Sequence, residues 1–143
     1  MSKQAQRRRA FTLVELLVVI VILSVLVGFL APNLFKQVGK SKVQVVKPKM
    51  TVIEGAIYRF YMDVERYPDE SEGLDALVEN LGAAAGWDGP YLKRSQIVDP
   101  WGNPYIYLPE GQINPGSFDL ICTGADGQEG GEEGTENADI YND

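Results

Sequence analysis

The sequence predicts an α+β fold, in which a long N-terminal helix packs on a small antiparallel β-sheet with a loop-rich C-terminal region. Three observations lead to this prediction. An almost unbroken apolar run extends from Leu16 to Ala31. Further along, apolar residues recur at three- and four-residue steps up to Val64, as on one face of a helix. Two short strand-like runs follow at residues 105–109 and 117–123, joined through turn-forming residues.

The apolar run is preceded by a basic head and followed by an acidic domain. The head contains four basic residues and no acid, so it is expected to stay on the cytoplasmic side while the rest crosses the membrane. Beyond Asn33 the chain has nine basic and nineteen acidic residues, a formal charge of −10. This acidic balance argues against nucleic acid as a partner.

A single carboxylate, Glu15, stands at the entrance of the apolar run. A charge in a membrane-embedded helix costs about 2.5–3.5 kcal/mol at the helix centre, so Glu15 needs a neutralising partner. A secretory signal would end in a small-residue cleavage site, but Pro32 follows Ala31 here. A plain membrane anchor would leave Glu15 without a partner.

A third interpretation places a cut between Ala10 and Phe11. The cut would remove a leader of residues 1–10 and create a free amino group at Phe11, one helical turn from Glu15. If helices stack with an axial offset, Glu15 of one chain can meet the Phe11 amine of its neighbour. A buried charge pair of this kind fixes the register between subunits more than it adds stability.

Composition excludes several catalytic sites. The chain has no histidine, which rules out Ser-His-Asp and Cys-His arrangements, and its single cysteine, Cys122, cannot form an internal disulfide. We expect Cys122 to be a small buried residue in an apolar strand, with pairing between chains as the alternative. The adjacent acids Glu132 and Glu133 have neither an activating partner nor an apolar cleft signature, so an enzyme is not expected.

The part from residue 33 to residue 143 is expected to form one domain after an apolar helix at 11–32. Pro48 should kink or break the long helix between Val46 and Met50. The helix should end at Tyr67-Pro68, and a short second helix should follow around 74–81.

The expected core stripe of the long helix is Val52, Ile53, Ala56, Ile57, Phe60, Tyr61 and Val64. Between residues 36 and 49 the helix has five lysines and no acid, which form either a solvated face or a belt that meets the acidic domain of a neighbour: Lys36, Lys40, Lys42, Lys47 and Lys49.

The segment Ala10-Phe11-Thr12-Leu13-Val14-Glu15-Leu16 resembles the class III signal of type IV pilins and pseudopilins. The resemblance implies cleavage by a prepilin peptidase after Ala10, where relatives usually have Gly, and N-methylation of Phe11. It also implies a pilin-like fold whose helix carries the assembly residues Phe11, Glu15 and Pro32.

Motifs beyond the signal resemble the major pseudopilins of type II secretion systems. In order these are Tyr67-Pro68, Gly73–Val78, Gly89–Lys93, Asp99-Pro100-Trp101-Gly102-Asn103-Pro104-Tyr105 and Gly124-Ala125-Asp126-Gly127. The match covers nearly the whole chain from Phe11, and its tryptophan turn is the most specific element. Type IV pilins share the head but usually close the C-terminal region with a disulfide, which this chain cannot form.

The resemblance implies a calcium site in the acidic tail from Asp126 to Asp143. From composition alone, the tail can be either a solvated acidic segment or a set of hard oxygen ligands. Carried over from the family, the candidate ligands are Asp126, Asp139, Asn137 and the carbonyl of Thr123.

The function implied is that of a structural subunit, not an enzyme. It would polymerise into a periplasmic fibre that drives export of folded proteins across the outer membrane. Each subunit would be a single-pass protein of the bacterial inner membrane, with its C-terminal domain in the periplasm. The implied partners are further copies, minor pseudopilins, the inner-membrane secretion platform, the prepilin peptidase and membrane lipid. A type IV or competence pilin is the alternative, and a membrane-anchored periplasmic binding protein or enzyme is a third.

Overall fold

A long helix, α1 (Leu13–Val64), forms the N-terminal part of the chain in the computed structural model, which describes residues 12–142 but not the side chains of residues 30–37. Thr12 caps this helix, because its hydroxyl oxygen accepts the backbone N–H of Glu15 at 3.2 Å. The apolar side chains described between Leu13 and Phe29 are exposed. Among the described residues, no helix is both long enough and apolar enough to cross a membrane.

The expected break at Pro48 is wrong, because α1 continues through it. Proline removes the hydrogen bond to the carbonyl of the residue four positions earlier, which is Gln44. Both Pro48 and Gln44 are exposed, so water can satisfy that carbonyl. Val46 and Met50, which flank the proline, are buried and hold the helix against the rest of the domain.

The chain divides into two compact units, Met1–Val38 and Gly39–Asp143, and the second contains the hydrophobic core. The helical face buried in it was largely predicted correctly: Ile53, Ala56, Ile57 and Phe60 are at most 4% exposed. The prediction was wrong for Val52 and Tyr61, which are 51% and 43% exposed. They lie on either side of the buried face, and Tyr61 stays partly exposed although its ring lies 4.8 Å from that of Tyr67.

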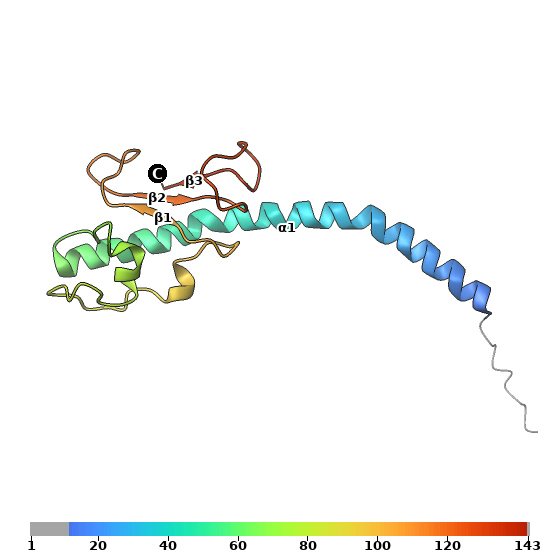
Figure 1. Ribbon diagram of the computed structural model, residues 1–143, viewed down its shortest axis with the longest axis horizontal. Helices are drawn as coiled ribbons and strands as arrows, with labels where there is room; N and C mark the ends of the chain where they lie inside the picture. The colour runs from blue at the N-terminus through green and yellow to red at the C-terminus, as the bar shows by residue number, and fades with distance from the viewer. Residues whose placement is uncertain (1–11, 143) are drawn as a thin grey trace, which may run out of the picture. The chain divides into compact units, whose positions relative to one another are not determined.

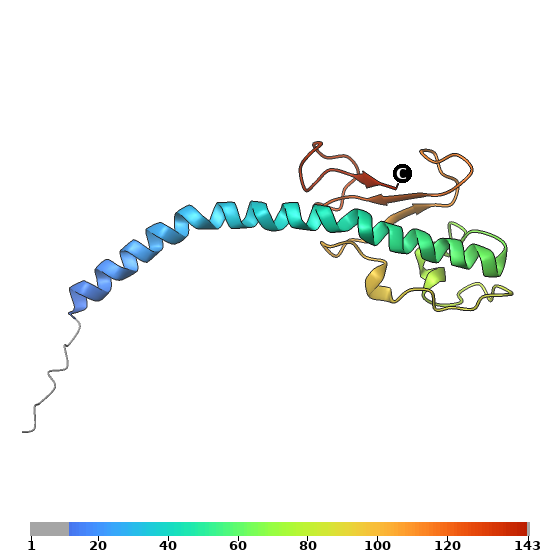
Figure 2. The ribbon, with the colours of Figure 1, turned by 180° about the vertical axis from the view of Figure 1, so that it is seen from behind.

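A three-stranded antiparallel sheet of order β1-β2-β3 packs on α1 within the second unit (Figures 1 and 2). Strands β1 (Ile106–Leu108) and β2 (Asp119–Cys122) lie inside the two predicted runs, and all four residues of β2 are buried. The third strand, β3 (Ile140–Tyr141), was not predicted. It comes from the acidic tail, whose composition gives no strand signal.

Most of the segment between α1 and β1 lies on the other side of the helix from the sheet (Figure 1), whereas Tyr67 and Pro68 at its start contact Phe118 and Tyr107. The predicted second helix is only a 3-10 helix at Gly73–Leu77, and another short one lies at Arg94–Gln96. The tryptophan turn is held by Asp99, whose carboxylate accepts the backbone N–H groups of Trp101 and Asn103, each at 2.8 Å. This turn, anchored by the buried Asp99, places Val98 and Trp101 against α1.

Candidate functional site

The N-terminal candidates are only partly within the described residues. Ala10 and Phe11 lie outside them, whereas Glu15 is exposed in the first turn of α1. Pro32 lies inside α1, but its side chain is not described. Glu15 occupies the third helical position after the Thr12 cap, where a Glu or Gln can complete a capping box. The spacing Thr12-x-x-Glu15 would therefore allow Glu15 a second role in helix capping.

The acidic tail is folded into a loop that closes on itself. Its turns use glycines with positive φ at positions 124, 127, 130, 131 and 134, a conformation that other residues adopt only with strain. The N–H of Ala125 donates to the carbonyl of Glu136 at 2.8 Å, and the N–H of Asp139 donates to that of Gly130 at 3.1 Å. A side chain on Gly131 would collide with the carbonyl of Asn137, so this close approach requires glycine.

Asp139 is the candidate ligand that the fold positions most clearly. One of its carboxylate oxygens, Oδ2, accepts the N–H of Gly130 at 2.8 Å and the hydroxyl of Tyr141 at 3.2 Å. Burial and this bond to Asp139 raise the pKa of the Tyr141 hydroxyl. The other oxygen, Oδ1, is buried and has no hydrogen-bond partner in the described structure. A buried carboxylate oxygen without a partner is costly, and a bound cation would remove that cost.

The other candidate ligands differ in how they are placed. Thr123 is buried, whereas Asp126 and Asn137 are exposed. Asp126 accepts the N–H of Gln128 at 3.1 Å, which closes a local turn. Within residues 12–142, no group of three or more Asp, Glu, Cys or His side chains is arranged to hold a metal ion. A calcium ion here would therefore need amide and backbone oxygens beside one or two carboxylates, all of which calcium accepts.

A second acidic residue, Asp119, was missed by sequence reasoning. It lies in β2, is 1% exposed, and binds the β1–β2 loop through both carboxylate oxygens. Oδ2 accepts the N–H of Gln112 at 2.7 Å and of Ile113 at 2.9 Å, while Oδ1 accepts that of Asn114 at 2.9 Å. Burial alone would raise the pKa of Asp119, but these backbone donors outweigh it and the pKa is lowered. An acid inside an otherwise apolar strand was the available signal.

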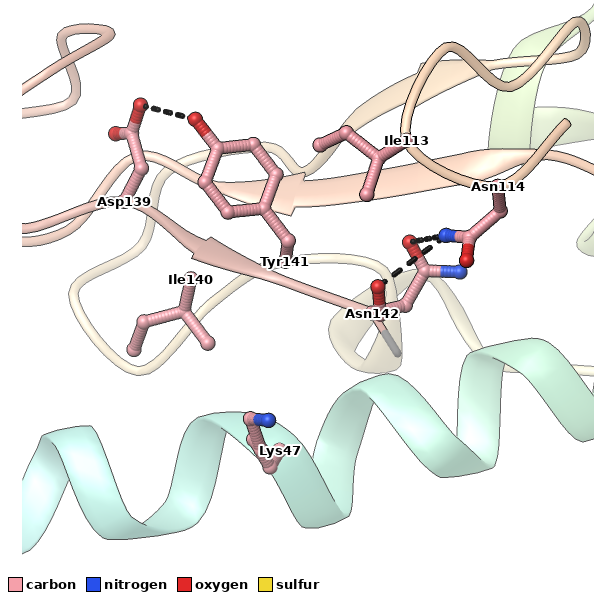
Figure 3. Close-up of a pocket in the computed structure, with 7 residues that line it drawn as sticks. All are labelled: Lys47, Ile113, Asn114, Asp139, Ile140, Tyr141 and Asn142. Atoms are coloured by element: carbon pink, nitrogen blue, oxygen red, sulfur yellow. Dashed lines mark hydrogen bonds between the residues drawn. The ribbon is translucent and has the colours of Figure 1, made fainter.

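A groove of about 600 Å³ separates β3 from α1 (Figure 3). Asn142 forms its floor and extends the sheet, because its Oδ1 accepts the N–H of Leu120 at 2.7 Å and its backbone carbonyl accepts Asn114 Nδ2 at 3.2 Å. Lys47 lines the α1 side of the groove and Ile113 the opposite side. The groove is open to solvent and contains no arrangement of groups that suggests catalysis.

Two lysines of α1, and Cys122, are also engaged within the subunit. Lys42 lies 5.9 Å from the centre of the Trp101 ring, and Lys49 donates to the carbonyl of Val98 at 2.9 Å. The predicted burial of Cys122 is confirmed, and its thiol lies 3.5 Å from Asp99 Oδ2. Burial raises the pKa of this thiol to about 11, so it is not a reactive cysteine.

Comparison with known proteins gives two family matches. The family described as "Type II secretion system (T2SS), protein G" matches residues 33–143, and "Prokaryotic N-terminal methylation motif" matches residues 5–31. The chain is 40% identical over 144 residues to the type II secretion system core protein G of Pseudomonas aeruginosa, with 97% of each chain covered. It is 41% identical to the Vibrio cholerae protein of the same name, covering 98% of this chain and 94% of that one.

A solved structure is similar over most of the chain. It is the major pseudopilin from the type 2 secretion system of enterohaemorrhagic Escherichia coli, with a TM-score of 0.58 and 32% sequence identity. The similarity covers 78% of this chain and 94% of that one. The long helix with a small antiparallel sheet is therefore the architecture of that protein.

Proposed function

The chain belongs to the family of type II secretion system protein G, and from this premise we infer that it is a structural subunit of the pseudopilus and not an enzyme. The observation that carries this conclusion is the match of residues 33–143 to that family, which covers the whole folded domain. The methylation motif at residues 5–31 makes the chain a membrane-anchored envelope protein. A type IV or competence pilin would share the N-terminal motif but not the domain.

The subunit assembles with copies of itself into a fibre and works with other secretion components. We propose that residues 11–32 anchor it in the inner membrane as a single pass before assembly, with residues 33–143 in the periplasm. The exposed apolar side chains of α1 between Leu13 and Phe29 support this, because they have no partner in the described structure. Lipid would cover them first and neighbouring subunits later. Minor pseudopilins, the inner-membrane platform and the prepilin peptidase are the proposed further partners.

Cleavage between Ala10 and Phe11 tests this proposal directly. The mass of the protein extracted from membranes should correspond to a chain that begins at Phe11 and carries one added methyl group. A matched variant, Ala10→Gly, restores the residue usual in the family and should give the same product. A mature protein that still begins at Met1 or Ser2 would support a plain anchor and contradict the proposal.

We further propose that the loop between Gly124 and Asp139 binds a structural calcium ion. The partnerless, buried Oδ1 atom of Asp139 supports this, and the other ligands would come from Asp126, Asn137 and the carbonyl of Thr123. When bound, the ion would supply positive charge and hold the loop closed. Since this loop leads into β3, closing it would also fix the edge of the sheet.

Removing calcium is expected to lower the melting temperature of residues 39–143 by roughly 5–10 °C. The measurement is thermal unfolding followed by circular dichroism, with and without a chelator. Asp139→Asn should melt at a lower temperature and no longer respond to the chelator. Glu133→Gln changes an exposed acid of the same loop that is not a proposed ligand, so it should respond like the parent. An unchanged melting temperature of the parent after chelation would contradict the site.

A further inference from the structure

Tyr141 is joined to Asp139, the candidate calcium ligand that the fold positions most clearly. Its hydroxyl donates to Asp139 Oδ2 at 3.2 Å, and the other carboxylate oxygen points away from the ring (Figure 3). Asp139 comes directly before β3, where the chain is extended. Side chains two residues apart in an extended chain lie on the same face, so the hydroxyl at position 141 can return to the carboxylate at position 139.

The two oxygens of the Asp139 carboxylate have different surroundings. Oδ2 has two donors, because the N–H of Gly130 reaches it at 2.8 Å from across the loop and the Tyr141 hydroxyl reaches it from β3. Oδ1 is buried and has no hydrogen-bond partner within the described residues. Two donors on one oxygen fix the rotation of the carboxylate group, so Oδ1 is the oxygen left for a cation.

The sheet holds the backbone that carries the Tyr141 ring. Tyr141 pairs with Ile121 in β2, and the next residue, Asn142, accepts the N–H of Leu120 through its side chain at 2.7 Å. The ring is 39% exposed and lines the groove beside β3 (Figure 3). The Tyr141 hydroxyl therefore approaches Asp139 from a segment that is anchored to β2.

We propose that Tyr141 is a positioning residue of the calcium site, which keeps Oδ1 of Asp139 directed at the ion without touching the ion itself. This inference rests on the proposed calcium site and goes beyond it, because Tyr141 is not among the proposed ligands. Residues that hydrogen-bond to a metal ligand orient that ligand, and their loss typically weakens metal binding by about 10- to 100-fold.

The same hydrogen bond links the ion to the edge of the sheet. If the Tyr141 hydroxyl strengthens calcium binding by a given factor, bound calcium strengthens the bond to Tyr141 by the same factor. Calcium would thereby hold β3 through a side chain as well as through the loop that leads into it. Removing the hydroxyl should break this link and leave the pairing of β3 with β2 intact, because that pairing uses backbone groups.

The variant Tyr141→Phe tests this role, because it removes only the hydroxyl group. It should weaken calcium binding about tenfold, at the low end of the range because the Tyr141 side chain is partly exposed. The measurement is isothermal titration of the full-length protein in detergent with calcium chloride, after bound calcium has been removed with a chelator. The control, Tyr58→Phe, removes the hydroxyl of another exposed tyrosine, whose ring packs against Phe118, and should bind calcium like the parent.

Thermal unfolding with and without calcium separates this role from a purely structural one. In chelator, the melting temperature of Tyr141→Phe should be close to that of the parent, and calcium should raise it by less than it raises that of the parent. An equal loss of melting temperature in both conditions, or a calcium dissociation constant equal to that of the parent, would overturn the inference. A parent protein that binds no calcium would instead overturn the proposed calcium site, and the inference with it.

Discussion

Replacing Glu15 with alanine is expected to abolish ordered fibre assembly while leaving membrane insertion intact. Insertion should become easier by about 2.5–3.5 kcal/mol at most, because a carboxylate is removed from the apolar segment. Assembly should fail because the Phe11 amine of the neighbouring subunit would lose its partner. Removing one member of a buried ion pair costs about 3–5 kcal/mol, which corresponds to roughly 100- to 4,000-fold weaker association. Assembly is measured as the amount of this protein in sheared fibres, relative to total membrane protein.

The Thr12 cap makes the choice of control variants important. Glu15→Gln can still complete a capping box, but it cannot neutralise an amine. Glu15→Asp keeps the charge with a shorter side chain. If the charge pair fixes the register, Glu15→Gln should fail like alanine, and Glu15→Asp should retain part of the assembly. Normal fibres and normal secretion from the Glu15→Gln variant would show that Glu15 acts only in capping the helix.

Asp119→Asn is expected to destabilise the folded domain by about 3–5 kcal/mol. The carboxylate accepts three backbone N–H groups of the β1–β2 loop, and an amide in its place would point a donor at some of them. Denaturant unfolding of residues 39–143 measures the loss. Asp88→Asn changes an exposed aspartate and should alter stability by less than about 0.5 kcal/mol. Equal stability of parent and Asp119→Asn would contradict this role.

The same residue should make stability depend on pH in the acid range. The pKa of Asp119 is lowered in the folded state, so the unfolded chain takes up its proton first as the pH falls. The stabilisation is therefore complete above the unfolded pKa of about 3.9 and is lost as the pH falls through the folded pKa. The difference in stability between parent and Asp119→Asn should shrink below about pH 4. A difference that stays constant down to pH 2 would exclude the charge as its cause.

The regular parts of the fold could be predicted from the sequence because their signals are local. Helical periodicity located the buried face of α1, and turn residues located β1 and β2. The errors came from tertiary contacts. The helix continues through Pro48 because its buried neighbours Val46 and Met50 hold it in place, and water can hydrogen-bond to the carbonyl of Gln44 that the proline leaves free. The strand β3 has no strand pattern of its own. It forms because β2 pairs with residues 140–141 and donates the N–H of Leu120 to the side chain of Asn142.

The candidate sites were predictable to different degrees. The N-terminal motif is read directly from Ala10 to Leu16 and agrees with the methylation-motif match. In the acidic tail, the sequence offered several equivalent acids, and only the fold distinguishes Asp139 by burying one of its oxygens. Asp119 was missed although its place in an otherwise apolar strand was a signal. The sequence does not show that the backbone N–H groups of residues 112–114, in the loop just before the strand, turn toward its carboxylate.

The sheet is small, and its two edges are short: β1 has three residues and β3 only two. A long, flat edge strand would be a template for amyloid-like pairing. The tendency of edge strands from different subunits to pair grows when many copies of a β-containing protein are close together, as they are along a fibre. Short edges offer a neighbouring domain little backbone to pair with, so the sheets of adjacent subunits are not expected to join.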